Sequence, residues 1–232
     1  MPSRVWADIS LDFIEALPKV HGKSVLLTVV DRFSKYAHFI PLGHPYTASS
    51  VARAFFQDIV RLHGFPESIV SDRDPVFTGH VWRDLFRHAG VQLRMSTAFH
   101  PQTDGQSEAV NKAITMYLRC LTGDRPRDWL DWLSWAEFCY NTAYHTTLQT
   151  TPFQVVYGRP PPDLLPYVPG EARTEAVDTM LSNRVSSWTR FTLAFSRRRS
   201  TLDASTTPST VPWSLSSGTG YYSACFIDTR SP

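Results

Sequence analysis

The sequence predicts an α/β domain in which a mixed sheet is flanked by helices. Strand-like segments come first, strand and helix patterns then alternate, and the later helical segments carry broad apolar faces. A chain of 232 residues with 42% hydrophobic and 19% charged residues fits one compact domain with an appendage.

The first strands are predicted from two kinds of hydrophobic pattern. Residues 8–14 alternate between apolar and polar side chains, whereas residues 24–31 form a continuous apolar run. The short connection between them contains Pro18 and Gly22, which favours an antiparallel hairpin. With residues 36–41 as a third strand, the segment is predicted to form a meander.

Strands and helices alternate in the middle of the chain. Apolar residues recur at helical spacing over residues 47–63, behind a Thr/Ser start that can cap a helix. A short apolar strand at residues 68–71 enters a turn, and a helix at 80–89 and a strand at 91–95 follow. The first and fourth strands of such a sheet can be neighbours.

Two more helices complete the predicted domain. A polar loop at residues 97–105 precedes a helix from about residue 106 to 121, and residues 129–145 form a second helix with broad apolar coverage. The aromatic residues of this second helix are expected in the core or at a dimer face. Proline density beyond residues 157–162 ends regular structure, so the domain boundary is predicted near residue 165.

Composition excludes several classes of protein. The net charge is only +2, so a DNA-binding surface would have to be a local patch. Cys120, Cys139 and Cys225 lie far apart without a CxxC pair, which argues against a disulfide framework or a zinc module. This cysteine usage fits a reducing, intracellular setting. Neither secretion nor membrane insertion is indicated, since no signal pattern and no membrane-spanning apolar run are found.

Three carboxylates lie at the edges of predicted elements. Asp12 is in the first strand, Asp72 follows the fourth strand, and Glu108 is in the first turns of the helix after the polar loop. Carboxylates gathered at one point repel one another unless divalent cations neutralise them. Their hard oxygen atoms suit Mg²⁺ or Mn²⁺, and two such ions can serve phosphoryl transfer.

Spacing alone leaves other acidic residues open for these roles. Asp8 lies on the same face of the first strand as Asp12 and could replace it. Asp31, Asp74 and Asp104 lie in turn-like contexts, where aspartate is ordinary. Most carboxylates in a soluble protein are simply solvated surface charges.

Four segments resemble the integrase core of gypsy-like LTR retrotransposons, within the retroviral-type integrase superfamily. These segments are ISLDFIEALPK, VVDRFSKYAHFIPL, IVSDRDPVFTGHVWRDLF and STAFHPQTDGQSEAVNKAITMYLR. The resemblance runs from about Trp6 to Pro161. Between Asp72 and Glu108 lie 35 residues (108 − 72 − 1), the interval of the D,D-35-E signature.

The resemblance implies a ribonuclease H-like fold and an enzyme whose catalytic residues and metal ligands are Asp12, Asp72 and Glu108. It selects Asp12 over Asp8, because the family's first ligand precedes a phenylalanine. Family members use Mg²⁺ or Mn²⁺, with two ions expected, to process the 3′ ends of element DNA and then join them to target DNA. A homo-oligomer acting in the nucleus is therefore expected.

Four polar residues are candidates for DNA contacts. Asn111 and Lys112 follow Glu108 at i+3 and i+4, so they share its helix face and could reach a phosphate. Gln102 and Gln106 belong to a loop that resembles the family's flexible active-site loop. The structural alternatives are an ordinary polar helix face for the first pair and a helix-capping connection for the second.

The tail departs from the family pattern. We divide the chain into a catalytic core at residues 1–165, a linker start at 166–183 and a disordered, out-of-frame tail at 184–232. Read in a shifted frame, the codons from Ser187 permit LDEVHARLLQAQEYARRF and those of 211–223 permit PMEFEFGDWVLLR, which resemble the family's linker helix and barrel. The hypothesis is a frameshift near residues 183–187, in a copy that also lacks the family's N-terminal zinc module.

Two other functions are weighed against the integrase reading. The chain could be a non-catalytic, nucleic-acid-binding remnant of an integrase, or a ribonuclease H-like nuclease. The three carboxylates Asp12, Asp72 and Glu108 are all present, which favours retained chemistry over the remnant.

Overall fold

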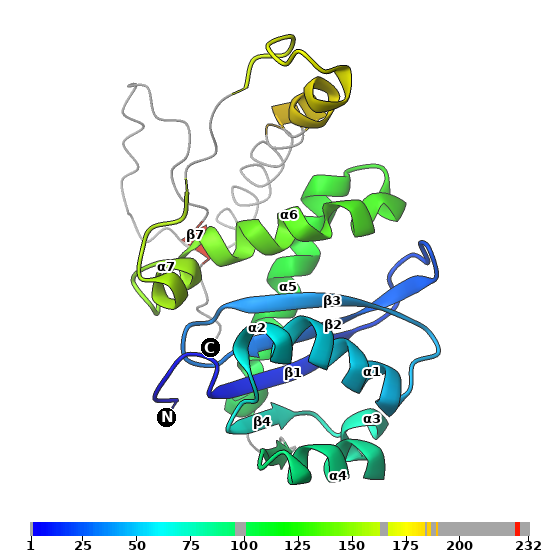
Figure 1. The fold of residues 1–232 in the computed structure, drawn as a ribbon, viewed down its shortest axis with the longest axis vertical. Helices are drawn as coiled ribbons and strands as arrows, with labels where there is room; N and C mark the ends of the chain where they lie inside the picture. The colour runs from blue at the N-terminus through cyan, green and yellow to red at the C-terminus, as the bar shows by residue number, and fades with distance from the viewer. Residues whose placement is uncertain are drawn as a thin grey trace, which may run out of the picture.

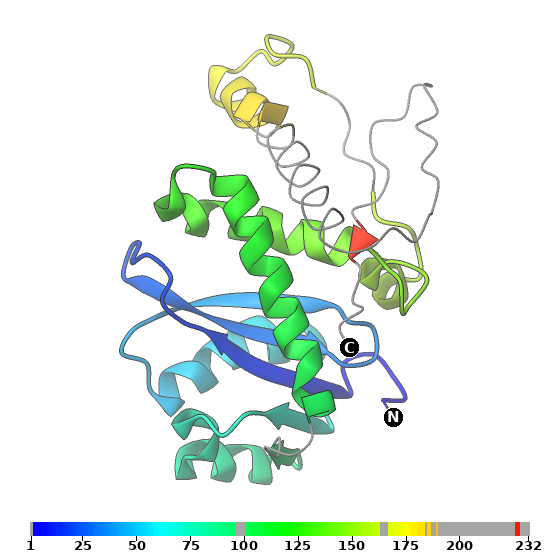
Figure 2. The same cartoon turned by 180° about the vertical axis from the view of Figure 1, so that it is seen from behind.

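The structure is a computed structural model, and Figure 1 and Figure 2 show the two faces of its ribbon. It describes residues 2–95, 101–162, 167–183, 185, 186, 189 and 226–227, without the side chains of 101–106 and 226–227. The predicted tail at 184–232 therefore lies outside the described residues, apart from these few positions. Within the described part, no helix combines the length and the apolar character needed to cross a bilayer.

A five-stranded mixed sheet forms the centre of the domain. The strands are β1 (Asp8–Ile14), β2 (Lys23–Asp31), β3 (Ala37–Gly43), β4 (Ser68–Ser71) and β5 (Gln92–Met95). Their order in the sheet is β3-β2-β1-β4-β5. The pairs β1–β2 and β2–β3 are antiparallel, whereas β4 runs parallel to both β1 and β5. The predicted meander, the neighbouring first and fourth strands, and the mixed sheet are all confirmed.

Both faces of the sheet are buried. Alternate side chains along the strands point to opposite faces, and each face has its own apolar core. Leu11 and Leu27 belong to the core on one face. Leu26 and Val30 belong to the core on the other face, where helices α5 and α6 pack. A sheet covered on both sides explains why the second strand is a continuous apolar run rather than an alternating one.

The first face is covered by a nearly continuous helical segment. It consists of α1 (Ala48–Phe55), a π-helical turn η1 (Phe56–Val60) and α2 (Arg61–His63). Thr47 and Ser50 form a capping box at its start, since each side chain accepts a hydrogen bond from the other residue's backbone N–H. The predicted helix over residues 47–63 is thus present, with a π-helical insertion that the periodicity did not indicate.

Two further helices follow β4 on this face. One is the short α3 (Pro75–Thr78), where the sequence predicted only a turn, and the other is α4 (His80–His88). The α3 turn begins because the Asp74 side chain accepts a hydrogen bond from the N–H of Val76, with proline at the first helical position. In α4, Trp82 is fully buried against the sheet core.

The second face is crossed by a long helix, α5 (Pro101–Thr122), and Figure 2 shows its course over the sheet. The prediction that this helix begins near residue 106 is wrong, because residues 101–105 are already helical. Proline is favourable in the first turn of a helix, which is consistent with Pro101 as the first residue of α5. The structure does not describe residues 96–100, so residues 97–100 of the predicted loop at 97–105 lie outside the described residues.

The chain then turns back through a 3-10 turn η2 (Pro126–Asp128) into α6 (Trp129–Thr142), which packs against α5. Trp129 and Tyr140 of α6 are buried, as expected for core residues. The remaining elements are β6 (Tyr144–His145), α7 (Pro152–Tyr157) and β7 (Phe226–Ile227), the last of which pairs with β6.

Side chains of α6 cover the outer edge of strand β3. The Asn141 amide accepts a hydrogen bond from the N–H of Ala37 at 2.9 Å and donates one to the carbonyl of Ala37 at 2.8 Å. Glu137 accepts another from the N–H of Phe39 at 3.0 Å. These side chains take the place of a neighbouring strand, because an edge strand otherwise presents unpaired backbone groups.

We expect Asn141→Ala to lower the free energy of unfolding by roughly 2–4 kcal/mol, because it leaves two backbone groups of Ala37 buried without partners. Urea denaturation followed by circular dichroism measures the loss. The control is Ser134→Ala, an exposed position on the same helix, which should change stability by less than about 0.5 kcal/mol. Equal effects of the two substitutions would contradict this account of the edge.

Candidate active site

Two of the predicted carboxylates come from adjacent parallel strands. In the β1–β4 pairing, Leu11 lies opposite Ser71. Asp12 and Asp72 are the next residues along these two chains, so the parallel register brings them to the same edge of the sheet. Both residues are half-buried.

Asp12 is held on both of its oxygen atoms. Its Oδ1 accepts a hydrogen bond from the N–H of Phe13 at 2.8 Å, and its Oδ2 accepts one from the Nδ2 of Asn111 at 2.8 Å. The Asn111 Oδ1 in turn accepts a hydrogen bond from the hydroxyl of Thr28 at 2.7 Å. Thr28 lies opposite Asp12 in the β1–β2 pairing and is fully buried. The Asn111 amide therefore connects β1 and β2 to helix α5.

Glu108 lies on α5, one helical turn before Asn111. Its carboxylate is exposed and pairs with the ammonium of Lys112 at 3.8 Å, four residues later on the same helix. Such a surface ion pair contributes little to stability. Because Asn111 fixes α5 to β1, Glu108 is held about one turn from the point where the helix touches Asp12.

The three predicted ligands are thus brought to one end of the sheet without forming a closed metal-binding group. In the described parts of the chain, no group of three or more His, Cys, Asp or Glu side chains is arranged to hold a metal ion. The assignment of Asp12, Asp72 and Glu108 as ligands stays a prediction.

Additional acidic residues surround Asp72 that the sequence reasoning did not assign to the site. Burial raises the pKa of Asp74, and the nearby charges of Asp72 and Glu15 raise it further, against the opposing effect of its hydrogen bond from Val76. Burial also raises the pKa of Tyr46, whose hydroxyl donates a hydrogen bond to Glu15 at 2.7 Å. Asp72, Asp74 and Glu15 therefore lie near one another at this end of the sheet.

The signals for these residues were weak in the sequence. Glu15 follows Asp12 by three residues at the end of the strand, which is a position that many solvated glutamates occupy. Thr28 lies within an apolar run, where a buried threonine predicts no particular partner. The contacts of Glu15 and Thr28 become visible only once the strands are paired and α5 is placed over the sheet.

The competing aspartates have other roles in the structure. The Asp8 carboxylate accepts a hydrogen bond from the hydroxyl of Ser68, near the start of β1 and about 13 Å along the strand from Asp12. The Asp31 carboxylate is buried at the end of β2, where it accepts hydrogen bonds from the N–H and the hydroxyl of Ser34. The side chain of Asp104 lies outside the described residues.

The candidate DNA contacts are only partly described. The side chains of Gln102 and Gln106 lie outside the described residues. Lys112 is exposed beside Glu108, and Asn111 is half-buried between Thr28 and Asp12. None of these contacts with DNA is tested by the structure, and all four stay predictions.

Comparisons with known proteins agree with this geometry. The family model for the integrase core domain matches residues 2–101. Transposon polyproteins Tf2-3 and Tf2-4 of Schizosaccharomyces pombe are both 39% identical to the chain over 154 residues, which is 66% of this chain. The match covers 12% of the length of these polyproteins, so the chain corresponds to a small part of each.

Solved integrase structures share the fold. The magnesium complex of the HTLV-2 integrase catalytic core domain, in its trimeric form, is 19% identical with a TM-score of 0.55, and the match covers 66% of this chain and 97% of that one. An intasome of simian T-cell lymphotropic virus bound to a PP2A regulatory subunit is 18% identical with a TM-score of 0.58, over 74% of this chain and 61% of that one.

The five-stranded mixed sheet with helices on both faces is the ribonuclease H-like fold of these cores, as the sequence predicted. Taken with the integrase core domain model that matches residues 2–101 and with the transposon relatives, it shows that the chain is similar to integrase catalytic cores of the LTR-retrotransposon type.

Proposed function

We propose that this chain is a metal-dependent polynucleotidyl transferase that processes the 3′ ends of retrotransposon DNA and joins them to target DNA. The observation that supports it most directly is the position of Asp12 and Asp72 at the shared end of two parallel strands. Helix α5 is fixed to the same point through Asn111, so Glu108 accompanies it. The 35 residues between Asp72 and Glu108 match the interval of the D,D-35-E integrase signature.

The donor set fits Mg²⁺ or Mn²⁺. The candidate ligands Asp12, Asp72 and Glu108 offer only carboxylate oxygens, which hard divalent cations prefer. The N–H of Phe13 and the Nδ2 of Asn111 orient the Asp12 carboxylate through its two oxygens. When bound, two such ions lower the pKa of an attacking water and stabilise the attacking and leaving oxygens of phosphoryl transfer.

The protein's own contribution is to hold the carboxylates before any ion arrives. Asn111 orients Asp12 by donating to one oxygen, and Thr28 fixes the Asn111 amide in turn. Glu15 and Asp74 add negative charge beside Asp72, which strengthens attraction for cations and opposes an approaching phosphate. Because these carboxylates repel phosphate unless cations neutralise them, DNA binding at the site would depend on divalent ions.

DNA is the proposed partner, both as element ends and as target. Gln102, Gln106, Asn111 and Lys112 are the proposed contacts, with Lys112 available to reach a phosphate from the exposed face of α5. Asn111 serves two roles in this proposal, because its amide is already engaged with Asp12. A homo-oligomer is proposed as the active form and the nucleus as its place of action.

Two alternatives remain distinguishable from the integrase. A non-catalytic remnant would bind DNA without metal-dependent chemistry. A ribonuclease H-like nuclease would cleave nucleic acid with the same carboxylates but would not join a 3′-hydroxyl to a second DNA. Strand joining is therefore the decisive activity.

We expect the chain to perform strand transfer or the reverse disintegration reaction in Mg²⁺ or Mn²⁺, and Glu108→Gln to lower the rate by at least about 100-fold. The glutamine keeps the size of the side chain and removes its charge. Gel assays with labelled branched DNA measure the reaction. The control is Asp131→Asn, an exposed carboxylate on α6, which should retain full activity. Inactivity of both the unmodified chain and Glu108→Gln would favour the remnant, and cleavage without joining would favour the nuclease.

The orienting role of Asn111 predicts a pH-dependent effect of Asn111→Asp. The new carboxylate lies against Asp12 and repels it, so the free energy of unfolding at pH 7 should fall by about 1–2 kcal/mol more than in Asn111→Ala. Repulsion raises the pKa of the carboxyl pair in the folded state, and the extra loss should therefore disappear as the pH falls through that raised value.

Urea denaturation at a series of pH values between 7 and 4 measures this difference. The alanine variant is the matched control, because it loses the same hydrogen bonds without adding charge. Addition of Mg²⁺ at pH 7 should reduce the extra loss in Asn111→Asp. A constant difference between the two variants across this range would show that Asn111 does not face an ionised Asp12.

A further inference from the structure

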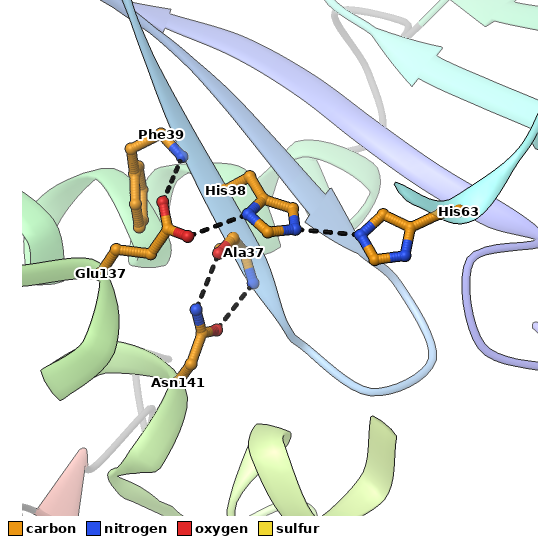
Figure 3. A network of polar contacts seen from close by, with 6 residues as sticks. All are labelled: Ala37, His38, Phe39, His63, Glu137 and Asn141. Carbon is orange, nitrogen blue, oxygen red and sulfur yellow. Dashed lines mark hydrogen bonds and ion pairs between the residues drawn. The ribbon is translucent and has the colours of Figure 1, made fainter. Parts of the chain in front are cut away.

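A chain of polar contacts passes around the outer edge of β3, on the side of the domain away from β4 and β5 (Figure 3). The Glu137 Oε1 of α6 lies 2.9 Å from the Nδ1 of His38 on β3. The Nε2 of His38 lies 3.0 Å from the Nε2 of His63 on α2. We call these three side chains, together with Trp6, the histidine clasp.

The indole of Trp6 completes the histidine clasp. It stacks on the His63 ring with a centroid separation of 3.8 Å and an interplanar angle of 8°. It also stacks on His38 at 5.3 Å and 21°. Trp6 is buried and lies just before β1. The clasp therefore joins the segment before β1, strand β3, helix α2 and helix α6.

The position of protons in the clasp follows from its geometry. A carboxylate only accepts hydrogen bonds, so the His38 Nδ1 must carry a proton towards Glu137. The contact between the two Nε2 atoms requires one nitrogen to donate and the other to accept. It is a hydrogen bond only when a single proton lies between His38 and His63.

We propose that the histidine clasp is a proton-controlled link between β3 and α2, closed by the single proton between His38 and His63 and opened when both rings are fully protonated. When both rings carry a proton on each nitrogen, both Nε2 atoms are donors, and two positively charged rings face each other with centroids 5.2 Å apart. Neither nitrogen then has an acceptor. The hydrogen bond must break, and the rings must separate.

The surroundings determine which side of the clasp opens. Glu137 remains beside His38 and stabilises its positive charge, and the Trp6 face can stabilise a protonated His63 by a cation–π contact. Other ionisable groups at the clasp are the hydroxyls of Tyr36 and Tyr157, whose rings contact each other and, for Tyr36, the His38 ring. Each histidine thus keeps its own partner, so the link between β3 and α2 is the one that is lost.

Burial lowers the pKa of His63 to about 4 from the ordinary value of 6.5, and the nearby His38 lowers it further in the same direction. A histidine with a lowered pKa in the folded state stabilises the closed form fully above the ordinary value. This stabilisation is lost as the pH falls through about 4. At neutral pH the clasp is closed.

Nuclear magnetic resonance on the full chain, labelled with ¹⁵N in its imidazole and indole groups, tests the proposal. As the pH falls from 7.5 to 3.5, the His63 ring nitrogens should titrate with a midpoint near pH 4. The Trp6 indole resonance, assigned by its absence in Trp6→Phe, should shift with the same midpoint. In His63→Gln the Trp6 resonance should not shift over this range, because glutamine does not take up a proton.

Two variants separate the clasp from general acid effects. His88→Gln replaces an exposed histidine on α4 and should leave the Trp6 titration unchanged. Glu137→Gln removes the charge that stabilises a doubly protonated pair, so the Trp6 midpoint should move to lower pH. Titration of His63 near 6.5 with a stationary Trp6 resonance would overturn the proposal. So would acid unfolding that precedes these shifts equally in the unmodified chain and in His63→Gln.

Discussion

The parallel pairing of β1 with β4 is the constraint on which the candidate site depends. Parallel strands end at the same edge of a sheet, and the register that sets Leu11 opposite Ser71 leaves Asp12 and Asp72 as the next residues of each strand. A shift of one residue would turn one of these carboxylates into the apolar core. The burial of alternate side chains on both faces of the sheet prevents such a shift, so packing fixes the site.

The Asn111 amide carries this constraint across to the helical layer. It binds Thr28 and Asp12, which lie 83 and 99 residues earlier in the chain. Without that contact, the position of α5 over the sheet would depend on apolar packing, which tolerates small sliding of a helix more readily than a hydrogen bond does. A catalytic group has to be held within a fraction of an ångström, so a directional hydrogen bond at this point would position α5 more precisely than apolar packing alone.

The parts of the fold that depend on neighbouring residues in the sequence were predictable from sequence patterns. Strand β4 was predicted with its observed bounds, and the Thr47 cap marked the start of α1, because both depend on neighbouring residues. The early start of α5 was missed, since a proline followed by turn-forming residues also predicts a loop. For the site, Asp12, Asp72 and Glu108 were selected over the other acidic residues only through a family resemblance. The contacts of Thr28 and Glu15 depend on tertiary structure.

Helix α6 protects the edge of β3, and the same helix places a carboxylate beside His38. An unprotected edge strand invites pairing with another chain, and α6 covers this edge with Asn141 and Glu137. A carboxylate in that position needs a donor for its second oxygen, and His38 is the side chain that supplies it. Because Nδ1 of His38 carries a proton towards Glu137, only Nε2 faces His63, and this contact is lost when both rings are fully protonated. Protection of the edge and the proton sensitivity of the clasp therefore have the same origin.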